Sequence, residues 1–201
     1  MSSRAGFTLL ESIVALVAFT VIGGALALAT RAGQQTERSV VDEASESHAL
    51  RSVTRALTDE LRSSSDTRIS VTALAGGNDS LRFLVPIQIG ATTDWGVYDK
   101  ALGDTEALQN RAGWSLRYTV ESVTTNGQTR RRLLRQELDD TQTVRRQRVV
   151  LDRLHSGGDT PPGFTVRKQG ALWEIKVSAG PRSGQGQGIQ ELFHVQARNL
   201  P

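Results

Sequence analysis

Residues that could carry catalysis or bind a metal are few and scattered in this chain of 201 residues. The sequence contains no cysteine, which excludes disulfides, thiol nucleophiles and thiolate metal sites. Its three histidines fall on three different predicted elements, without a hydrolase or zinc-protease motif around them. The adjacent acids Asp139 and Asp140 offer too few ligands for a cation and are typical of a turn. We therefore expect no catalytic residue, no metal site, no cofactor and no enzyme activity.

Arginine is the one chemically distinctive residue type that clusters. Between Gln128 and Arg153 there are eight arginines and four acids, an excess of four positive charges. Such clusters bind phosphates, an acidic protein surface, or simply keep a sheet edge from aggregating. The stretch has no aromatic residue that could stack on bases, yet DNA stays open as a partner. The candidate basic patch consists of Arg130, Arg131, Arg132, Arg135, Arg145, Arg146 and Arg148.

A single carboxylate, Glu11, stands at the start of a long apolar segment. Residues 12–30 carry no formal charge, and at ~1.5 Å per residue they form ~29 Å of helix, close to the ~30 Å core of a bilayer. An ionised carboxylate at this depth is costly unless it finds a partner. A plain signal anchor with Arg4 on the cytoplasmic side does not explain it. A cleaved secretory signal would fit Ala25-Leu26-Ala27, but its apolar region is normally only ~7–15 residues long.

The six residues Gly6-Phe7-Thr8-Leu9-Leu10-Glu11, followed by this apolar run, resemble the prepilin signal of type IV pilins and pseudopilins. The resemblance implies cleavage between Gly6 and Phe7 by a prepilin peptidase and N-methylation of the new amino terminus at Phe7. It also implies that Glu11 meets the amino terminus of a neighbouring subunit during assembly. Such a pair is a means of setting register rather than a source of stability. The implied partners are the peptidase, other pilin or pseudopilin subunits and the inner membrane.

Beyond the apolar segment the helical pattern continues. Val53, Leu57 and Leu61 recur every four residues, after Val40, Val41, Ala44 and Leu50, so one stripe of a helix is apolar. We predict one helix of ~55–60 residues that ends near Ser63–Asp66 and packs against the rest of the chain. The expected divisions are a leader (1–6), a transmembrane and assembly helix (7–30), its amphipathic continuation (31–65) and a β-rich head (66–201).

The head is predicted to consist of antiparallel strands. Residues 114–121 alternate between apolar and polar side chains, and Asn126-Gly127 is a strong hairpin signal. Residues 87–112 are predicted to be a long loop with room for a short helix, and Pro86 is expected to close the strand before it. The fold class is therefore α+β, pilin-like, with a long N-terminal helix packed on an antiparallel sheet. Other strands are predicted at 80–85, 129–138, 149–154, 164–169, 172–179 and around Phe193 and Val195. Of these, 164–169 and 172–179 are expected to form a hairpin with Trp173, Ile175 and Val177 on one face.

The strand order of the head is similar to that of PilW-type minor pilins and, equally, of J-type pseudopilins of type II secretion. Four positions carry this similarity: Tyr118, Leu134, Arg135 and Trp173. It implies a minor pilin-like structural subunit that is built into a type IV pilus or primes its assembly. The alternatives are a type II secretion pseudopilin and a DNA-uptake pilin that uses the arginine cluster. In each case the chain would be a single-pass inner-membrane protein with its head outside the cytoplasm.

Overall fold

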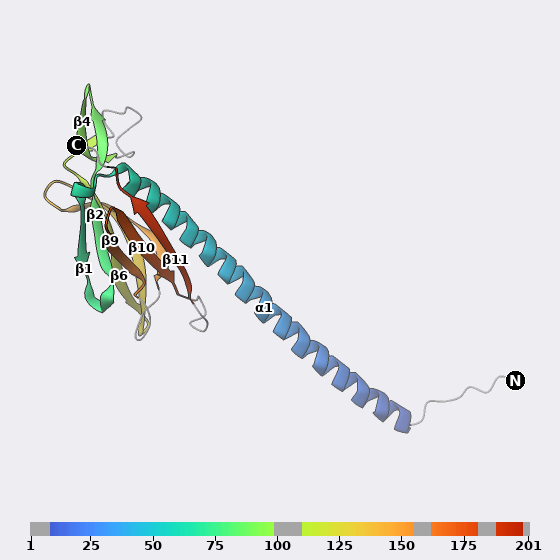
Figure 1. Ribbon diagram of the computed structural model, residues 1–201. Coiled ribbons are helices and arrows are strands. Elements are labelled where there is room, and N and C mark those ends of the chain that lie inside the picture. The colour runs from blue at the N-terminus through green and yellow to red at the C-terminus, as the bar shows by residue number, and fades with distance from the viewer. Residues whose placement is uncertain (1–8, 99–109, 155–161, 181–187, 199–201) are drawn as a thin grey trace. The chain divides into compact units, whose positions relative to one another are not determined.

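The computed structural model describes residues 9–98, 110–154, 162–180 and 188–198 (Figure 1). The chain forms two compact units, Met1–Ala44 and Ser45–Pro201. The first unit holds the beginning of helix α1 (Leu9–Ser63), and the second holds the end of this helix and all the strands. A long apolar N-terminal helix followed by a domain rich in antiparallel sheet confirms the α+β class.

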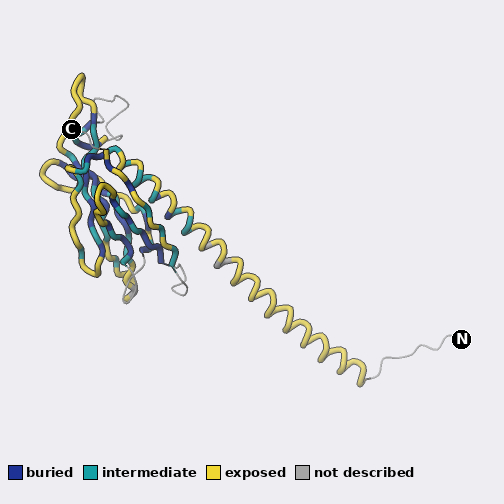
Figure 2. Tube along the Cα trace, in the orientation of Figure 1, coloured by how far each residue is buried: buried dark blue, intermediate teal, exposed yellow. Residues whose placement is uncertain are grey.

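The N-terminal part of α1 is long and apolar enough to cross a membrane. By length and composition the candidate span is Leu9–Glu37, with a mean hydropathy of 2.4. Its large apolar side chains are exposed, Phe19 to 81% for example (Figure 2). The hydroxyl groups of Thr20 and Thr30 each donate a hydrogen bond to the carbonyl oxygen four residues earlier. These polar groups are thus satisfied within the helix, as a bilayer would require.

The second unit is built around an eight-stranded sheet in which every neighbouring pair is antiparallel. Strand β9 pairs with β10 over most of its length, and β8 meets β10 only at Ala179, so β8 and β9 share one edge of β10 while β11 takes the other. The order along the sheet is β1 (Ile69–Ala73), β2 (Asp79–Phe83), β6 (Ser115–Thr125), β7 (Gln128–Leu138), β8 (Val144–Leu154), β10 (Leu172–Ala179) and β11 (Ile189–Gln196), with β9 (Phe164–Gln169) beside β10.

The end of α1 packs on this sheet through the expected apolar stripe. Leu50, Val53, Leu57 and Leu61 are buried and belong to one core cluster with side chains from the sheet, such as Phe83. The stripe prediction is therefore confirmed from residue 50 onward. By contrast, residues 40 and 41 of the first unit are exposed. The helix ends at the predicted place, because Ser63 is its last residue.

Both predicted hairpins are present. At the β6–β7 turn Asn126 and Gly127 have positive φ values of 52° and 75°. A type I′ turn needs positive φ at both central residues, which is why Asn-Gly is such a strong signal. In the β9–β10 hairpin the alternation also holds, because Trp173, Ile175 and Val177 are all buried.

The prediction of a loop over residues 87–112 is wrong for the part that the structure describes. A three-stranded sheet lies there, made of β3 (Val85–Ile89), β4 (Thr92–Tyr98) and β5 (Asn110–Ala112), with residues 99–109 outside the described ranges. Pro86 does not close a strand but lies inside β3, where an edge position tolerates its missing N–H. A side chain at Gly96 would collide with the carbonyl oxygen of Arg111, so glycine permits the close pairing of β4 and β5.

Two further differences concern strand extent. Neither strand β1 nor the short 3₁₀ turn η1 (Asp66–Arg68) that precedes it was predicted. Strand β8 begins at Val144 rather than at residue 149. Its first half is mostly arginine and glutamine, so apolar alternation is absent there, and backbone pairing with β7 defines the strand instead.

Hydrogen bonds from backbone N–H groups to side-chain oxygens, rather than backbone pairing, connect β9 to the start of β2. The backbone N–H groups of Phe164 and Val166 donate to the side-chain oxygens of Asn78 (3.1 Å) and Asp79 (2.8 Å). Asn78 is almost completely buried and follows η2 (Ala75–Gly77), so these hydrogen bonds lie at the start of β2. Two backbone N–H groups at this edge of β9 are in this way satisfied without a neighbouring strand.

Candidate functional site

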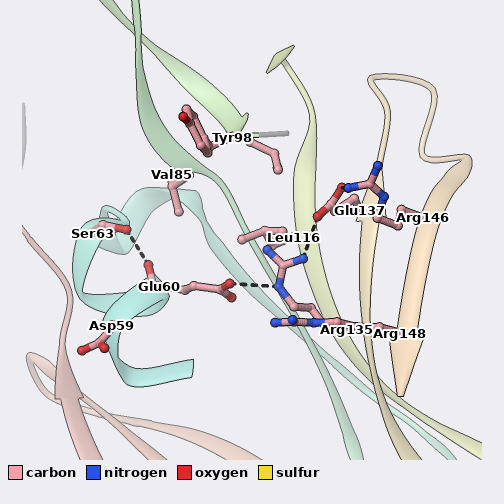
Figure 3. A pocket seen from close by; sticks show the side chains of 11 residues that line it. Asp59, Glu60, Ser63, Val85, Tyr98, Leu116, Arg135, Glu137, Arg146 and Arg148 are labelled. Atoms are coloured by element: carbon pink, nitrogen blue, oxygen red, sulfur yellow. Dashed lines mark hydrogen bonds and ion pairs between the residues drawn. The ribbon is translucent and has the colours of Figure 1, made fainter. Parts of the chain in front are cut away.

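A cavity of about 680 Å³ with several charged lining residues lies in the second unit (Figure 3). It lies where the last turn of α1 meets strands of both sheets. One wall is polar and contains three arginines and three acids, whereas the other is formed by Val85, Val97, Tyr98 and Leu116. The polar lining residues are Asp59, Glu60, Ser63, Arg135, Glu137, Arg146 and Arg148.

Glu60 is the centre of the polar wall. Its carboxylate accepts hydrogen bonds from the Tyr118 hydroxyl (2.8 Å) and from Arg135 Nε (2.9 Å). Arg135 Nη1 in turn donates to Glu137 Oε1 at 2.7 Å. The side chains of Arg135 and Glu137 are only 13% and 7% exposed. Charged side chains are stable in such buried positions only when they are paired. The network therefore holds the end of α1 against β6 and β7.

The network keeps Tyr118 and Arg135 in their usual protonation states. Burial, with the Glu60 carboxylate beside it, raises the pKa of Tyr118 well above its usual range, so the phenol stays a donor. Burial alone would lower the pKa of Arg135, but the carboxylates of Glu60 and Glu137 outweigh it, and this pKa is raised. The geometry therefore suits a permanent ion pair better than proton transfer.

A second connection joins the residues just after α1 to the β9–β10 hairpin. Trp173 Nε1 donates to Asp66 Oδ1 at 2.9 Å, and Lys168 pairs with the other oxygen of the same carboxylate. Lys168 Nζ also lies 5.6 Å from the centre of the Trp173 ring, within the range of a cation–π contact. The hydrogen bond from Lys168 lowers the pKa of Asp66, assisted by Trp173 and opposed by burial.

The structure does not bring the seven arginines of the candidate basic patch together. Because β6 and β7 pair without interruption, Arg131 and Arg135 lie on one face of β7, and Arg130 and Arg132 lie on the other. On β8, Arg146 and Arg148 lie opposite Glu137 and Arg135, so they join the cavity.

Several of these arginines pair with acids. Arg132 pairs with Asp152 at 2.6 Å, and Arg145 pairs with Asp139 at 2.6 Å. The Asp139 carboxylate also accepts from the Thr141 hydroxyl and the Thr143 N–H, and these hydrogen bonds lower its pKa to about 2. The interpretation of Asp139 as a turn residue thus has a structural basis. For the arginines, no geometry in the described residues favours DNA over an acidic protein surface as the partner.

The predicted processing site lies mostly outside the described residues, which begin at position 9, so Gly6 and Phe7 are not placed. Glu11 lies in the first turn of α1 and is exposed. A carboxylate in the first turn is favoured by the positive end of the helix dipole.

The residues that carry the resemblance of the head have a common role. Tyr118 and Arg135 bind Glu60, and Trp173 binds Asp66, so three of the four join the end of α1 to the sheet. Leu134 differs, because it lies on the other face of β7. Sequence reasoning missed the acidic partners Glu60, Glu137 and Asp66. Glu60 and Asp66 have partners that are distant in the sequence, so no local signal marks them. Glu137 pairs with Arg135 two positions earlier on the same strand, a spacing that places both side chains on one face.

The chain matches no protein-family model, no curated protein and no solved structure in the comparisons. The site and the fold therefore carry the functional argument alone.

Proposed function

We propose that this protein is a minor pilin-like structural subunit. In this proposal a prepilin peptidase cleaves it between Gly6 and Phe7, Phe7 is N-methylated, and the mature chain is built into a type IV pilus or primes its assembly. The chain is then a single-pass inner-membrane protein before assembly, with its β-rich head outside the cytoplasm.

One observation carries the proposal: the prepilin-like GFTLLE stretch leads directly into a helix with an exposed apolar surface. This helix runs for 55 residues from Leu9 to Ser63. Its first 29 residues are apolar enough for a bilayer, and its last turns are bonded to the head. An anchor that must later pack among identical helices needs this continuous apolar surface, and a carboxylate at its start is costly there unless it is paired.

A J-type pseudopilin of type II secretion would have the same signal, helix and head. The residues that support the head resemblance, Tyr118, Arg135 and Trp173, serve both settings equally because they hold α1 to the sheet. The difference lies in the assembled filament. Co-purification with pilus subunits or with secretion pseudopilins, in cells that carry both machines, distinguishes the two.

The test of the proposal is the mass of the mature amino terminus. The full-length chain is produced in a host with a prepilin peptidase, extracted from membranes and analysed by mass spectrometry. We expect a chain that begins at Phe7 and carries one methyl group. Gly6→Leu is expected to leave the chain uncleaved, whereas the matched control Gly23→Leu changes a glycine inside the apolar helix and leaves cleavage intact.

A mature chain that begins near Thr30 would indicate an ordinary secretory signal and would overturn the proposal. An unprocessed wild-type chain in the presence of an active peptidase would overturn it as well. Processing of a known prepilin in the same cells shows that the peptidase is active.

A further inference from the structure

The polar wall of the cavity contains a carboxylate oxygen with unmet hydrogen-bonding capacity. Glu137 Oε1 accepts from Arg135, but Glu137 Oε2 is fully buried and accepts no hydrogen bond. Arg146 Nη1 lies 3.9 Å from this oxygen, which is close enough for an ion pair but too far for a hydrogen bond. Leaving a buried carboxylate oxygen without a donor is costly, so this position favours a bound group.

The chemistry of the two flanking groups restricts what that bound group is. An ionised carboxylate only accepts hydrogen bonds, and a guanidinium only donates them. A hydroxyl group does both. It can donate to Glu137 Oε2 and accept from Arg146 Nη1 when the half-exposed Arg146 side chain moves outward, because Oε2 is closed to solvent in the present arrangement. An ammonium group meets only half of this requirement, because it would face the Arg146 guanidinium with a like charge.

A second feature of the cavity calls for an anionic group. Arg148 lies opposite Arg135 on the neighbouring strand and lines the cavity. Within the described residues it forms no ion pair with an acid, whereas the two carboxylates beside it, Glu60 and Glu137, are bonded to Arg135. In Figure 3 the third acid, Asp59, points away from this group. Arg148 is therefore the lining arginine to which we assign an anionic group of the ligand.

The opposite wall offers an apolar surface for the body of a ligand. Val85, Val97 and Leu116 contribute aliphatic groups, and the Tyr98 ring is 40% exposed. A volume of about 680 Å³ lies within the ordinary range of small-molecule sites, which is roughly 300–1,000 Å³. One apolar wall with a few convergent polar groups is also their usual composition.

We propose that this cavity binds a hydroxylated carboxylate of the size of a sugar acid. A ligand hydroxyl bridges Glu137 Oε2 and Arg146 Nη1, the ligand carboxylate binds Arg148, and the carbon skeleton lies against Leu116 and Tyr98. Binding is non-covalent, and the site is separate from the amino-terminal processing that the proposed function requires. A failure of either proposal therefore leaves the other standing.

Three sugars with the same ring and different charge test the ligand class. Isothermal titration calorimetry uses the full-length chain in a detergent without a sugar headgroup, with glucuronate, glucose and glucosamine as the probes. We expect glucuronate to bind tightest, glucose to bind about tenfold more weakly because it lacks the charged hydrogen bond to Arg148, and glucosamine to bind weakest.

Matched variants locate the site. Arg148→Gln is expected to lower the affinity for glucuronate to that for glucose, about tenfold, and to leave glucose binding unchanged. Arg130→Gln removes the same charge from the same sheet outside this cavity and is the control, expected to change neither affinity. Glu137→Gln is expected to weaken binding of all three sugars, and tryptophan fluorescence checks that this variant folds.

Several results would overturn the proposal. They are the absence of saturable heat with glucuronate at about 10 mM, equal affinity for the three sugars, or a preference for glucosamine. An equal loss in Arg148→Gln and Arg130→Gln would also overturn it, because it would indicate general attraction between the basic head and an anion. Since Arg148 is exposed and makes no ion pair in the described residues, its variant tests the site even if Glu137→Gln does not fold.

Discussion

The two parts of helix α1 differ in how their apolar side chains are exposed. Along Leu9–Glu37 the helix is apolar and its side chains are exposed, with Leu26 and Leu28 exposed to 68% and 71%. Along residues 45–63 only one stripe is apolar, and its Leu57 and Leu61 are completely buried. The described large apolar side chains of the first part are not covered within its own compact unit, whereas the apolar stripe of the second part packs against the head.

This contrast shows that one continuous helix can carry two kinds of stability. The second part is stabilised by burial against the sheet and by ion pairs such as Glu60–Arg135. The described apolar side chains of the first part are exposed, so a bilayer or other helices would stabilise it, as the proposed function requires. Changes in the first part should therefore affect assembly, and changes in the second part should affect folding.

The largest expected effect is on assembly, from a change in the first part. Glu11→Val removes the only acid at the start of the apolar segment, and we expect insertion into the membrane to continue while incorporation into filaments is lost. Fractionation of membranes and of sheared filaments, followed by immunoblotting, measures both. The control is Glu37→Gln, an acid at the far end of the span, and normal assembly of the Glu11 variant would contradict the proposed role.

The next effect is on folding, and it compares one leucine from each part. Leu57→Ala removes a completely buried side chain and is expected to lower the free energy of unfolding by about 3 kcal/mol. Leu16→Ala, in a 70% exposed position, should leave it unchanged. Urea titration followed by the fluorescence of the three tryptophans, all of which belong to the second unit, measures the difference. Equal losses would break the comparison.

A change at the end of α1 separates ion pairing from apolar burial. Glu60→Ala leaves the guanidinium of Arg135 without its helix partner, and we expect a loss of about 3 kcal/mol because a buried charge loses its pair. Asp59→Ala, one residue earlier on an exposed position, is the control and should change stability by less than about 0.5 kcal/mol. If the Glu60 variant is as stable as wild type, the network does not hold the helix.

The smallest effect is a pH dependence at the connection after the helix. The folded-state pKa of Asp66 lies below its ordinary value of 3.8, so its contribution to stability is complete well above pH 3.8 and is lost as pH falls below it. Melting temperatures of wild type and Asp66→Asn should therefore differ at pH 6 and converge at low pH. Asp140→Asn, an exposed turn residue, is the control. A constant difference at all pH values would contradict this assignment.

Periodic patterns predicted the parts of this fold that obey a local rule. The helix stripe, the Asn126-Gly127 turn and the alternation around Trp173 each repeat a geometry that a few neighbouring residues determine. Strands β3–β5 were missed because Pro86 suggested the end of a strand, whereas at an edge position a proline is compatible with a strand. The first half of β8 was missed because pairing with β7, not apolar burial, defines it.

The site was less accessible from the sequence. The arginine cluster was visible, but its division between two faces of β7 depends on the register of the strands. Glu60 and Arg135 are 75 residues apart in the chain, and nothing near either residue predicts the other. The prepilin-like stretch was visible for the opposite reason, since all its residues are adjacent.

The side-chain hydrogen bonds from Asn78 and Asp79 to the N–H groups of Phe164 and Val166 have a consequence for crowding. A strand with a row of unused N–H groups recruits strands from other molecules, and membrane-tethered chains meet one another at high local concentration. On β9 two short polar side chains accept from two of these N–H groups without adding a strand. These N–H groups are then not available to a strand of another molecule, which disfavours edge-to-edge aggregation at β9. Contacts between copies of this protein are expected at other surfaces.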